Sequence, residues 1–194
     1  MAPPMKGKQQ NRKTVRVQQI VEVAEPAELV RFYEDDVSML WWQQELLPDA
    51  SAVLAREPFT WTSEVSASGA ELSGLEPFVS SSAVLERARE LVELHSALFE
   101  AEAVGVRVAL TQTPLCPSFH LNKLHARLLT TLAGPGTQWA LGPLYKLTAS
   151  SEVQQLPSGA VGWFKGLAWP GVSPLAHRSP PGDARRLVLS IDLL

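Results

Sequence analysis

His120 and Asn122 are the residues of this chain whose types and spacing best suit a metal ion. They lie two positions apart, and on an extended strand such side chains point to the same face. A second histidine, His177, follows 57 residues later. Arg185 and Arg186 come eight and nine residues after His177 and carry the planar charge that binds carboxylates. These residues predict a site for a metal ion and an anion.

The order of these residues is similar to that in the jelly-roll iron oxygenases, where two histidines and one carboxylate hold Fe(II) and leave positions open for oxygen and a 2-oxo acid. Fe(II) and 2-oxoglutarate are therefore the first cofactor candidates. Arg186, which begins an apolar run, or Arg185 before it would bind the distal carboxylate of the oxo acid. Arg178, directly after His177, is a further candidate catalytic residue.

Position 122 departs from this pattern because an asparagine oxygen can ligate a metal but brings no negative charge. From residue 105 onward the chain has three carboxylates: Glu152, Asp183 and Asp192. We expect Asp183 on a turn, from which it can reach inward, and Asp192 near the end of a strand. The scarcity of carboxylates argues against full iron-oxygenase activity and leaves the question of an enzyme open.

Two alternatives follow from the same residues. Cys116, four residues before His120, could join His120 and His177 in a Cys-His-His set that suits Zn(II) better than iron; otherwise Cys116 is a buried small residue. The other alternative is an interaction domain without turnover, in which both histidines are only satisfied polar groups.

The predicted secondary structure changes near residue 104, from mixed and helical segments to short strands. Before it we expect a strand over 15–23, a short helix over 27–33 after Pro26, a strand or helix ending at Leu47, and an irregular stretch over 51–80. Residues 82–103 have helical apolar spacing, and a serine at position 81 or 82 can cap that helix.

Short β-type runs separated by Gly and Pro occupy the rest of the chain. They cover residues 106–111, 126–132, 137–141, 153–156, 160–165 and 186–192. Gly134-Pro135-Gly136 between two of them indicates a tight turn. The predicted fold class is α+β, with N-terminal helices packed on an antiparallel double-stranded β-helix, or jelly-roll-like, core.

The expected organisation is a flexible basic tail over 1–14 and a single domain over 15–194. Within that domain, 15–104 would form a helical or irregular layer and 105–194 the β core. Residues 1–17 hold five basic residues and no acid, residues 18–104 four basic and seventeen acidic, and residues 105–194 eight basic and three acidic. A basic core suits an anionic small-molecule cosubstrate.

Composition excludes several classes of protein. One cysteine in 194 residues rules out an internal disulfide framework. No apolar run is long enough to span a membrane, and no apolar segment follows the basic N-terminus as in a secretory signal, so the expected location is the cytoplasm. The sequence has no cluster of basic and aromatic residues of the kind that binds nucleic acid, so nucleic-acid binding is not expected.

Three stretches of the C-terminal half resemble the bacterial family catalogued as domain of unknown function 1826. The family pattern has a C-P-x-F-H-x-D run, R-L-L-x-T, G-P-G-T-x-W, a K-G step, and H-R-S-P followed by R-L and a terminal strand ending in Asp. The matching residues here are Cys116, Pro117, Phe119, His120, Arg127, Leu128, Leu129, Thr131, Gly134, Pro135, Gly136, Thr137, Trp139, Lys165, Gly166, His177, Arg178, Ser179, Pro180, Arg186 and Asp192. The run V-S-M-L-W-W-Q is similar as well, so the resemblance covers residues 20–194.

The resemblance implies a jelly-roll core like that of iron oxygenases. It also implies a link to metal homeostasis, with a metal-handling protein as partner. Asn122 stands where the family has Asp. The resulting hypothesis is a metal-binding, dioxygenase-like protein, and the alternative is a zinc-binding or catalytically degenerate interaction protein.

Overall fold

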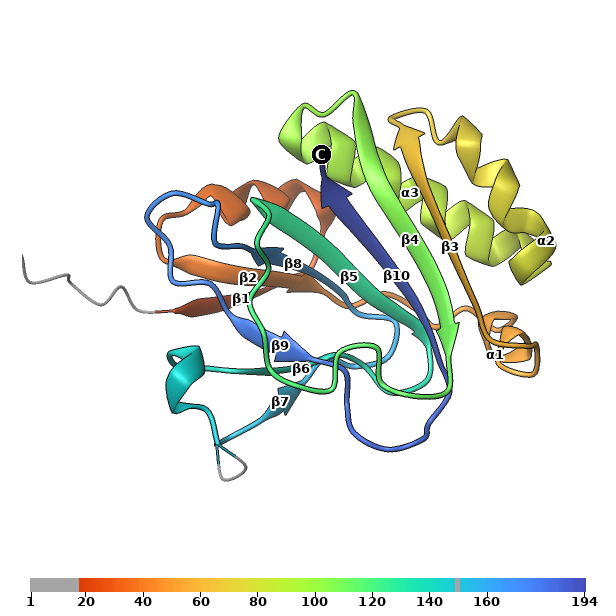
Figure 1. Ribbon diagram of the computed structural model, residues 1–194. Coiled ribbons are helices and arrows are strands. Elements are labelled where there is room, and N and C mark those ends of the chain that lie inside the picture. Colours follow the sequence, from red (N-terminus) through yellow and green to blue (C-terminus); the bar gives the residue numbers. More distant parts are fainter. Residues whose placement is uncertain (1–17, 149–150) are drawn as a thin grey trace, which may run out of the picture.

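The computed structural model describes residues 18–148 and 151–194 (Figure 1). The tail expected over 1–14 lies outside these residues. The strands are β1 (Gln19–Val23), β2 (Val37–Trp42), β3 (Phe59–Ser66), β4 (Ala103–Thr111), β5 (Ala126–Ala133), β6 (Gln138–Ala140), β7 (Gln154–Gln155), β8 (Val161–Lys165), β9 (Ala176–Arg178) and β10 (Arg186–Leu193). The helices are η1 (Pro26–Tyr33), α1 (Ala50–Val53), η2 (Ala70–Leu75), α2 (Glu76–Val79), α3 (Ser82–Phe99) and η3 (Leu144–Lys146).

Two sheets form the described part of the chain. The major sheet has seven strands in the order β1-β2-β8-β5-β10-β4-β3, and the minor sheet has the order β7-β6-β9 (Figure 1). Every neighbouring pair is antiparallel except β1 and β2, which are parallel. The expected purely antiparallel core is thus corrected to an antiparallel-rich sheet with one parallel edge pair.

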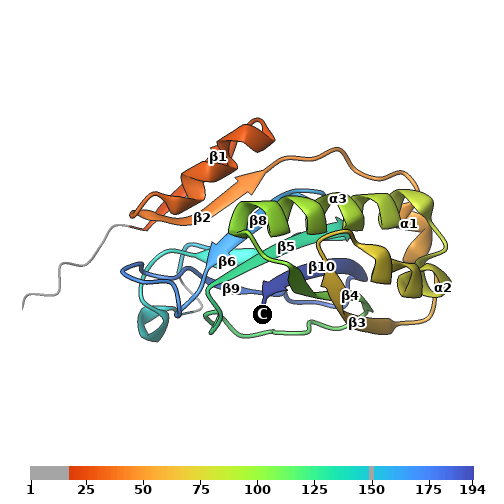
Figure 2. The ribbon, with the colours of Figure 1, turned by 90° about the horizontal axis from the view of Figure 1, so that it is seen from above.

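The two faces of β10 have different roles because successive side chains of a strand point to opposite sides. Leu187, Leu189 and Ile191 face the main apolar core. Helix α3, whose first turn is capped by the Ser81 hydroxyl accepting from the amide of Val84 at 3.3 Å, contacts β4 and β10. Figure 2 shows α3 lying along the sheet. The opposite face of β10 is free to line a site.

The layer expected over 15–104 differs from the structure. This half contributes β1, β2 and β3 to the same major sheet as the C-terminal strands, and α3 is the one helix longer than eight residues in the described ranges. Strand β3 falls in the stretch predicted to be irregular. Its alternating Phe, Thr and Trp residues favour a strand once β4 provides a partner edge.

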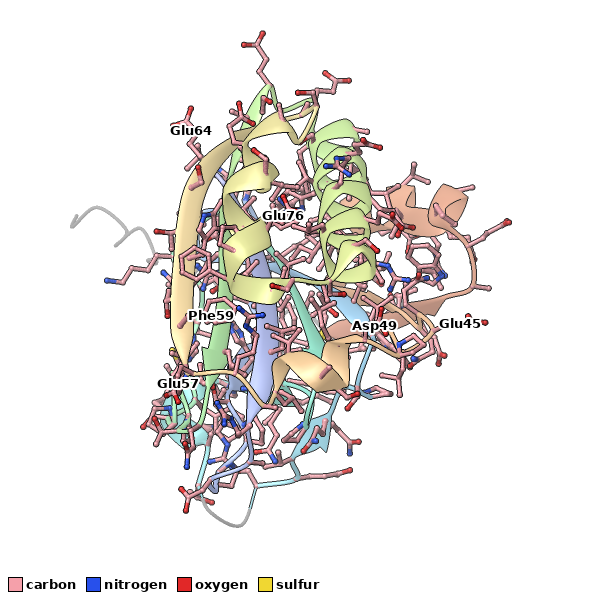
Figure 3. All side chains as sticks on the ribbon, turned by 90° about the vertical axis from the view of Figure 1, so that its right-hand side faces the viewer. Glu45, Asp49, Glu57, Phe59, Glu64 and Glu76 are labelled. Carbon is pink, nitrogen blue, oxygen red and sulfur yellow. The ribbon has the colours of Figure 1, made fainter. Side chains whose placement is uncertain are left out.

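The face that carries α1, α2 and α3 is strongly acidic. Figure 3 shows Glu45, Asp49, Glu57, Glu64 and Glu76 there with their carboxylates turned outward, and all five residues are exposed. The acidic charge of the first half therefore lies on the surface, whereas four arginines of the second half line the site described next: Arg107, Arg127, Arg178 and Arg186. Within the described ranges, no helix has the length and apolar character needed to cross a membrane.

Candidate functional site: a histidine pair facing a buried arginine

His120 and His177 lie directly opposite each other on neighbouring extended segments. Each backbone amide donates to the other residue's carbonyl oxygen at 3.1 Å, which forms an isolated antiparallel bridge. Residues paired in this way present their side chains on the same face of the sheet. The two imidazole centroids are 4.5 Å apart. The predicted approach of these two histidines, 57 positions apart in the sequence, is thus present in the structure.

Hydrogen bonds define which ring nitrogen of each histidine is free. Nδ1 of His120 lies 3.2 Å from the carbonyl oxygen of Ser118, and Nδ1 of His177 lies 3.3 Å from that of Leu175. A carbonyl oxygen only accepts, so Nδ1 carries the proton in both contacts, and Nε2 is left with its lone pair. Nε2 of His177 is buried and has no hydrogen-bond partner. This arrangement is typical of histidines that ligate a metal through Nε2.

Burial keeps His177 neutral. Desolvation lowers the pKa of His177 to about 3, with smaller contributions from nearby His120 and Arg127. Its ring is 2% exposed and packs against Phe164 of β8 with centroids 4.8 Å apart. The neutral imidazole is the form that ligates a metal, so His177 needs no deprotonation at physiological pH before it binds one.

A small, open cavity lies between the histidine pair and the major sheet. The face of β10 opposite the apolar core contributes Arg186, Val188 and Ser190, and β4 and β5 contribute alternate residues beside them. The lining residues are Arg107, Ala109, Leu115, Cys116, His120, Arg127, Leu129, Thr137, His177, Arg178, Ser179, Arg186, Val188 and Ser190. None of these is a carboxylate, so the cavity has the character of an anion site.

Arg186 is held in the cavity wall by neutral groups. Its Nε donates to the carbonyl oxygen of Pro135 at 2.7 Å, and one terminal nitrogen donates to the hydroxyls of Thr131 at 3.1 Å and Thr137 at 3.3 Å. Burial lowers the pKa of Arg186 to about 10, which leaves the side chain cationic at neutral pH. It is a fixed buried cation without a carboxylate partner in the described chain, and therefore a strong binding group for an anion.

The Gly134-Pro135-Gly136 segment positions this arginine. Gly134 has a φ of 88°, in the left-handed region that favours glycine. A Cβ on Gly134 would overlap the carbonyl oxygen of Arg185, and one on Gly136 would overlap that of Leu156. The turn was predicted, but its role was not. By packing against the start of β10, it brings a backbone carbonyl and Thr137 to the guanidinium of Arg186.

The other two predicted arginines are engaged elsewhere. The half-buried side chain of Arg185 donates to the carbonyl oxygen of Arg56 and does not line the cavity. Arg178 reaches the cavity wall beside His177, but its guanidinium lies 4.4 Å from the centre of the Phe119 ring and donates to the Gln138 side chain at 3.0 Å. Arg186 is therefore the arginine best placed for the role predicted at this point of the chain.

Asn122 is buried, and Arg127 engages its amide. The Asn122 Oδ1 accepts from Arg127 at 3.0 Å, while its Nδ2 has no partner. Arg127 also forms a two-pronged ion pair with Asp192, its cross-strand neighbour, with the second contact at 2.7 Å. The amide oxygen expected to ligate a metal is thus already bound by a cation, and the nearby carboxylate of Asp192 is engaged by the same arginine.

The Cys-His-His alternative is not assembled. In residues 18–148 and 151–194, no three His, Cys, Asp or Glu side chains gather closely enough to hold a metal. Cys116 is exposed at the cavity rim and not buried as its small apolar character suggested. Its backbone is tied to Ser179 by two hydrogen bonds of 3.3 and 2.9 Å. Asp183 is exposed and not part of the cavity lining.

Four residues that line or shape the cavity were not predicted as site residues from the sequence. Arg107 and Arg127 contribute cations to the cavity, and Thr131 and Thr137 hold Arg186. Arg107 and Arg127 lie on predicted strands, where alternation places each on one face. Which face lines a site depends on how the strands pair, so the sequence alone did not distinguish these arginines from surface residues.

Three similar solved structures share 9–14% sequence identity with this chain. A dioxygenase for auxin oxidation from rice superposes with a TM-score of 0.56 at 14% identity, covering 90% of this chain and 82% of that one. A full-length Neurospora crassa protein, in complex with alpha-KG and 5-formyluracil, gives 0.53 at 9% identity over 93% and 85%. A putative oxygenase from Shewanella oneidensis gives 0.51 at 14% identity over 91% and 89%. The shared fold is the double-stranded β-helix of these oxygenases.

Sequence comparison gives the family. No curated protein matches the chain. The family model described as "Protein of unknown function (DUF1826)" matches residues 24–192, which include His120, His177, Arg186, strands β2 to β9 and β10 up to Asp192. The match agrees with the motifs identified in the sequence. This chain therefore belongs to the DUF1826 family.

Proposed function

We propose that this protein binds Fe(II) through His120 and His177 and a 2-oxo acid such as 2-oxoglutarate through Arg186, in the manner of the oxygenases whose fold it shares. The observation that carries the proposal is the facing pair of imidazoles, with Nδ1 of each on a carbonyl oxygen and the buried Nε2 of His177 without a partner. A divalent metal supplies the missing partner for that lone pair.

The residues of the cavity provide part of a binding site for Fe(II) and a 2-oxo acid. Two neutral imidazoles are good ligands for Fe(II), and the metal, when bound, supplies the redox centre for reaction of oxygen with the oxo acid. Arg186 binds and orients the distal carboxylate, while Thr131 and Thr137 fix its fork. The third, anionic protein ligand is missing, because Asn122 is uncharged and held by Arg127. We therefore expect metal affinity to depend strongly on the bound oxo acid.

Metal binding tests the first half of the proposal. We expect purified protein to bind Mn(II), as an oxygen-stable substitute for Fe(II), in anaerobic calorimetry with 2-oxoglutarate present. His120→Ala and His177→Ala should each abolish binding, and His125→Ala, which removes an exposed histidine outside the cavity lining, should retain it. Equal metal binding by all three variants would remove His120 and His177 from the proposal.

Cosubstrate binding and turnover test the second half. Arg186→Gln should weaken 2-oxoglutarate binding while the protein still takes up metal. With Fe(II) and oxygen, the wild-type chain should consume 2-oxoglutarate slowly. Asn122→Asp supplies the missing carboxylate and is expected to raise that rate if the new group reaches the metal instead of pairing with Arg127. No consumption by either protein would refute an oxygenase activity.

Metal handling without turnover is the second candidate function. It is favoured by the absence of a carboxylate from the cavity lining, since imidazole ligands alone suit Zn(II) as well as iron. Here the protein would bind Zn(II) at the same histidines and deliver or sense it with a metal-handling partner. Metal content of protein purified without added metal, together with the turnover assay, distinguishes zinc from iron and binding from catalysis.

A further inference from the structure

The cavity contains a second cation that neither the metal nor the 2-oxo acid uses. Arg107 of β4 lines the cavity and is exposed at its mouth, where it also borders a hollow lined by Glu64 and Asp192. Its side chain makes no hydrogen bond or ion pair with the described residues. In contrast, Arg127 is neutralised by Asp192. An arginine facing a cavity without a carboxylate in its lining is a ready binding group for an acidic ligand.

Strand register places Arg107 away from Arg186. Arg186 pairs with Thr111, whereas Arg107 pairs with Ser190, four residues further along β10. At the rise of a β-strand these rows are about 13 Å apart, and the row between them carries Val188 and Ala109. That interval is longer than an extended five-carbon dicarboxylate. A single 2-oxo acid on Arg186 therefore leaves Arg107 for another group.

Arg107 lies toward the end of the sheet near the histidine pair. The His177 ring packs on Phe164, and Phe164 is the cross-strand partner of Arg127. Arg127 in turn is in the row next to that of Arg107 and Ser190. Arg107 thus stands at the metal end of the cavity, where a substrate must approach to react, while Arg186 stands at the other end.

Charge balance leads to the same conclusion. A divalent metal, Arg107, Arg178 and Arg186 bring five positive charges, and 2-oxoglutarate brings two negative ones, while Arg127 is balanced by Asp192. Because Asn122 gives no charge, three positive charges remain, and in a cavity partly closed to water such an excess is costly unless an anion compensates it. Ala109, Leu115, Leu129 and Val188 add an apolar surface between the charged groups.

We propose that the substrate of this site is a small organic acid with an apolar body, and that Arg107 binds its carboxylate or phosphate while the body lies against Leu129 and Val188. This inference rests on the proposed metal and 2-oxo acid binding, and it assigns to Arg107 the role of a substrate-binding residue. Neither the family match nor the similar structures specify this substrate class.

The test uses calorimetry with the full chain loaded with Mn(II) and 2-oxoglutarate without oxygen. The probes are 3-phenylpropanoate, its neutral amide 3-phenylpropanamide, and phenyl phosphate. We expect the carboxylate or the phosphate to bind at least about tenfold more tightly than the amide, as loss of one charge-assisted hydrogen bond predicts. A preference between the two acids identifies the acidic group.

The control variants separate Arg107 from general electrostatics. Arg107→Gln should abolish the preference for acid over amide, whereas Lys123→Gln, which removes an exposed cation next to Asn122 but outside the cavity lining, should keep it. Three results would show that the inference is wrong while the proposed function stands, provided that metal and 2-oxoglutarate bind. The acids could bind no more tightly than the amide, they could fail to bind at millimolar concentration, or Arg107→Gln could keep the preference for acid over amide. If the loading titration itself shows no metal or oxo acid, the proposed function fails and the charge argument fails with it.

Discussion

Replacing His95 should remove a defined part of the acid sensitivity of folding. His95 lies in α3, is fully buried, and packs edge-on against Phe99 with centroids 4.8 Å apart. Neither of its ring nitrogens has a hydrogen-bond partner. Because burial without a partner disfavours the charged ring, desolvation lowers the pKa of His95 from 6.5 to about 3.

The sign and size of the effect follow from this pKa. Between pH 6.5 and about 3, the unfolded chain binds a proton at His95 that the folded chain does not, so the free energy of unfolding falls as the pH falls. Each pH unit in this interval is worth about 1.4 kcal/mol. At pH 5, His95 should therefore have reduced the free energy of unfolding by about 2 kcal/mol relative to pH 8.

Urea unfolding followed by tryptophan fluorescence measures this difference. The wild-type protein should lose about 2 kcal/mol more stability between pH 8 and pH 5 than His95→Leu, which fills the site without a titrating group. His95→Gln serves as a second variant, and His125→Gln removes an exposed imidazole as a control. If wild type and both His95 variants lose stability equally, His95 is not the buried neutral histidine described above.

Two further predictions concern the cavity. Asp192→Asn removes the carboxylate partner of Arg127. Because the two side chains are only 22% and 23% exposed, the free energy of unfolding, measured by urea titration, should fall by about 1–3 kcal/mol. An unchanged free energy of unfolding would mean that the ion pair does not stabilise the fold. Gly134→Ala should weaken 2-oxoglutarate binding at Arg186 while metal binding persists, because its Cβ overlaps a backbone carbonyl. Gly142→Ala has a similar positive φ but open space around its Cβ, so calorimetry that shows the same loss in both variants would contradict a specific role for the Gly134 turn.

Local patterns were enough to predict most strands of the second half and the long helix. The strands predicted over 106–111, 126–132, 160–165 and 186–192 overlap β4, β5, β8 and β10, because β-branched residues and Gly or Pro boundaries act over a few positions. Strand β9, with three residues, was not predicted because Pro174 and Pro180 flank a run without alternating apolar residues. Strand β3 was missed because its Ser and Thr residues resemble a loop until β4 pairs with it.

The candidate site was predictable only in part. The order of His120, His177 and Arg186 in the sequence suggested a metal site with an anion, since ligand types and strand alternation are local properties. The structure changed the role of Asn122: its oxygen accepts from Arg127, a contact that depends on β5 lying next to the segment that holds Asn122. The two residues are only five positions apart, but their hydrogen bond depends on how the chain turns between Asn122 and the start of β5, which residue spacing alone does not predict.

The sequence by itself determined which chemical groups are available in the second half: three histidines, several arginines and only three carboxylates. It also determined the family, because its motifs are continuous runs of residues. Only the tertiary structure decided which of these groups share a cavity. Strand pairing put His120 beside His177, bound Arg127 to Asp192, and left Arg107 and Arg186 facing the cavity without a carboxylate. The physical reason is that the type of a residue determines its charge and the metals it can ligate. The distances between such residues depend on the register of strands that are far apart in the sequence.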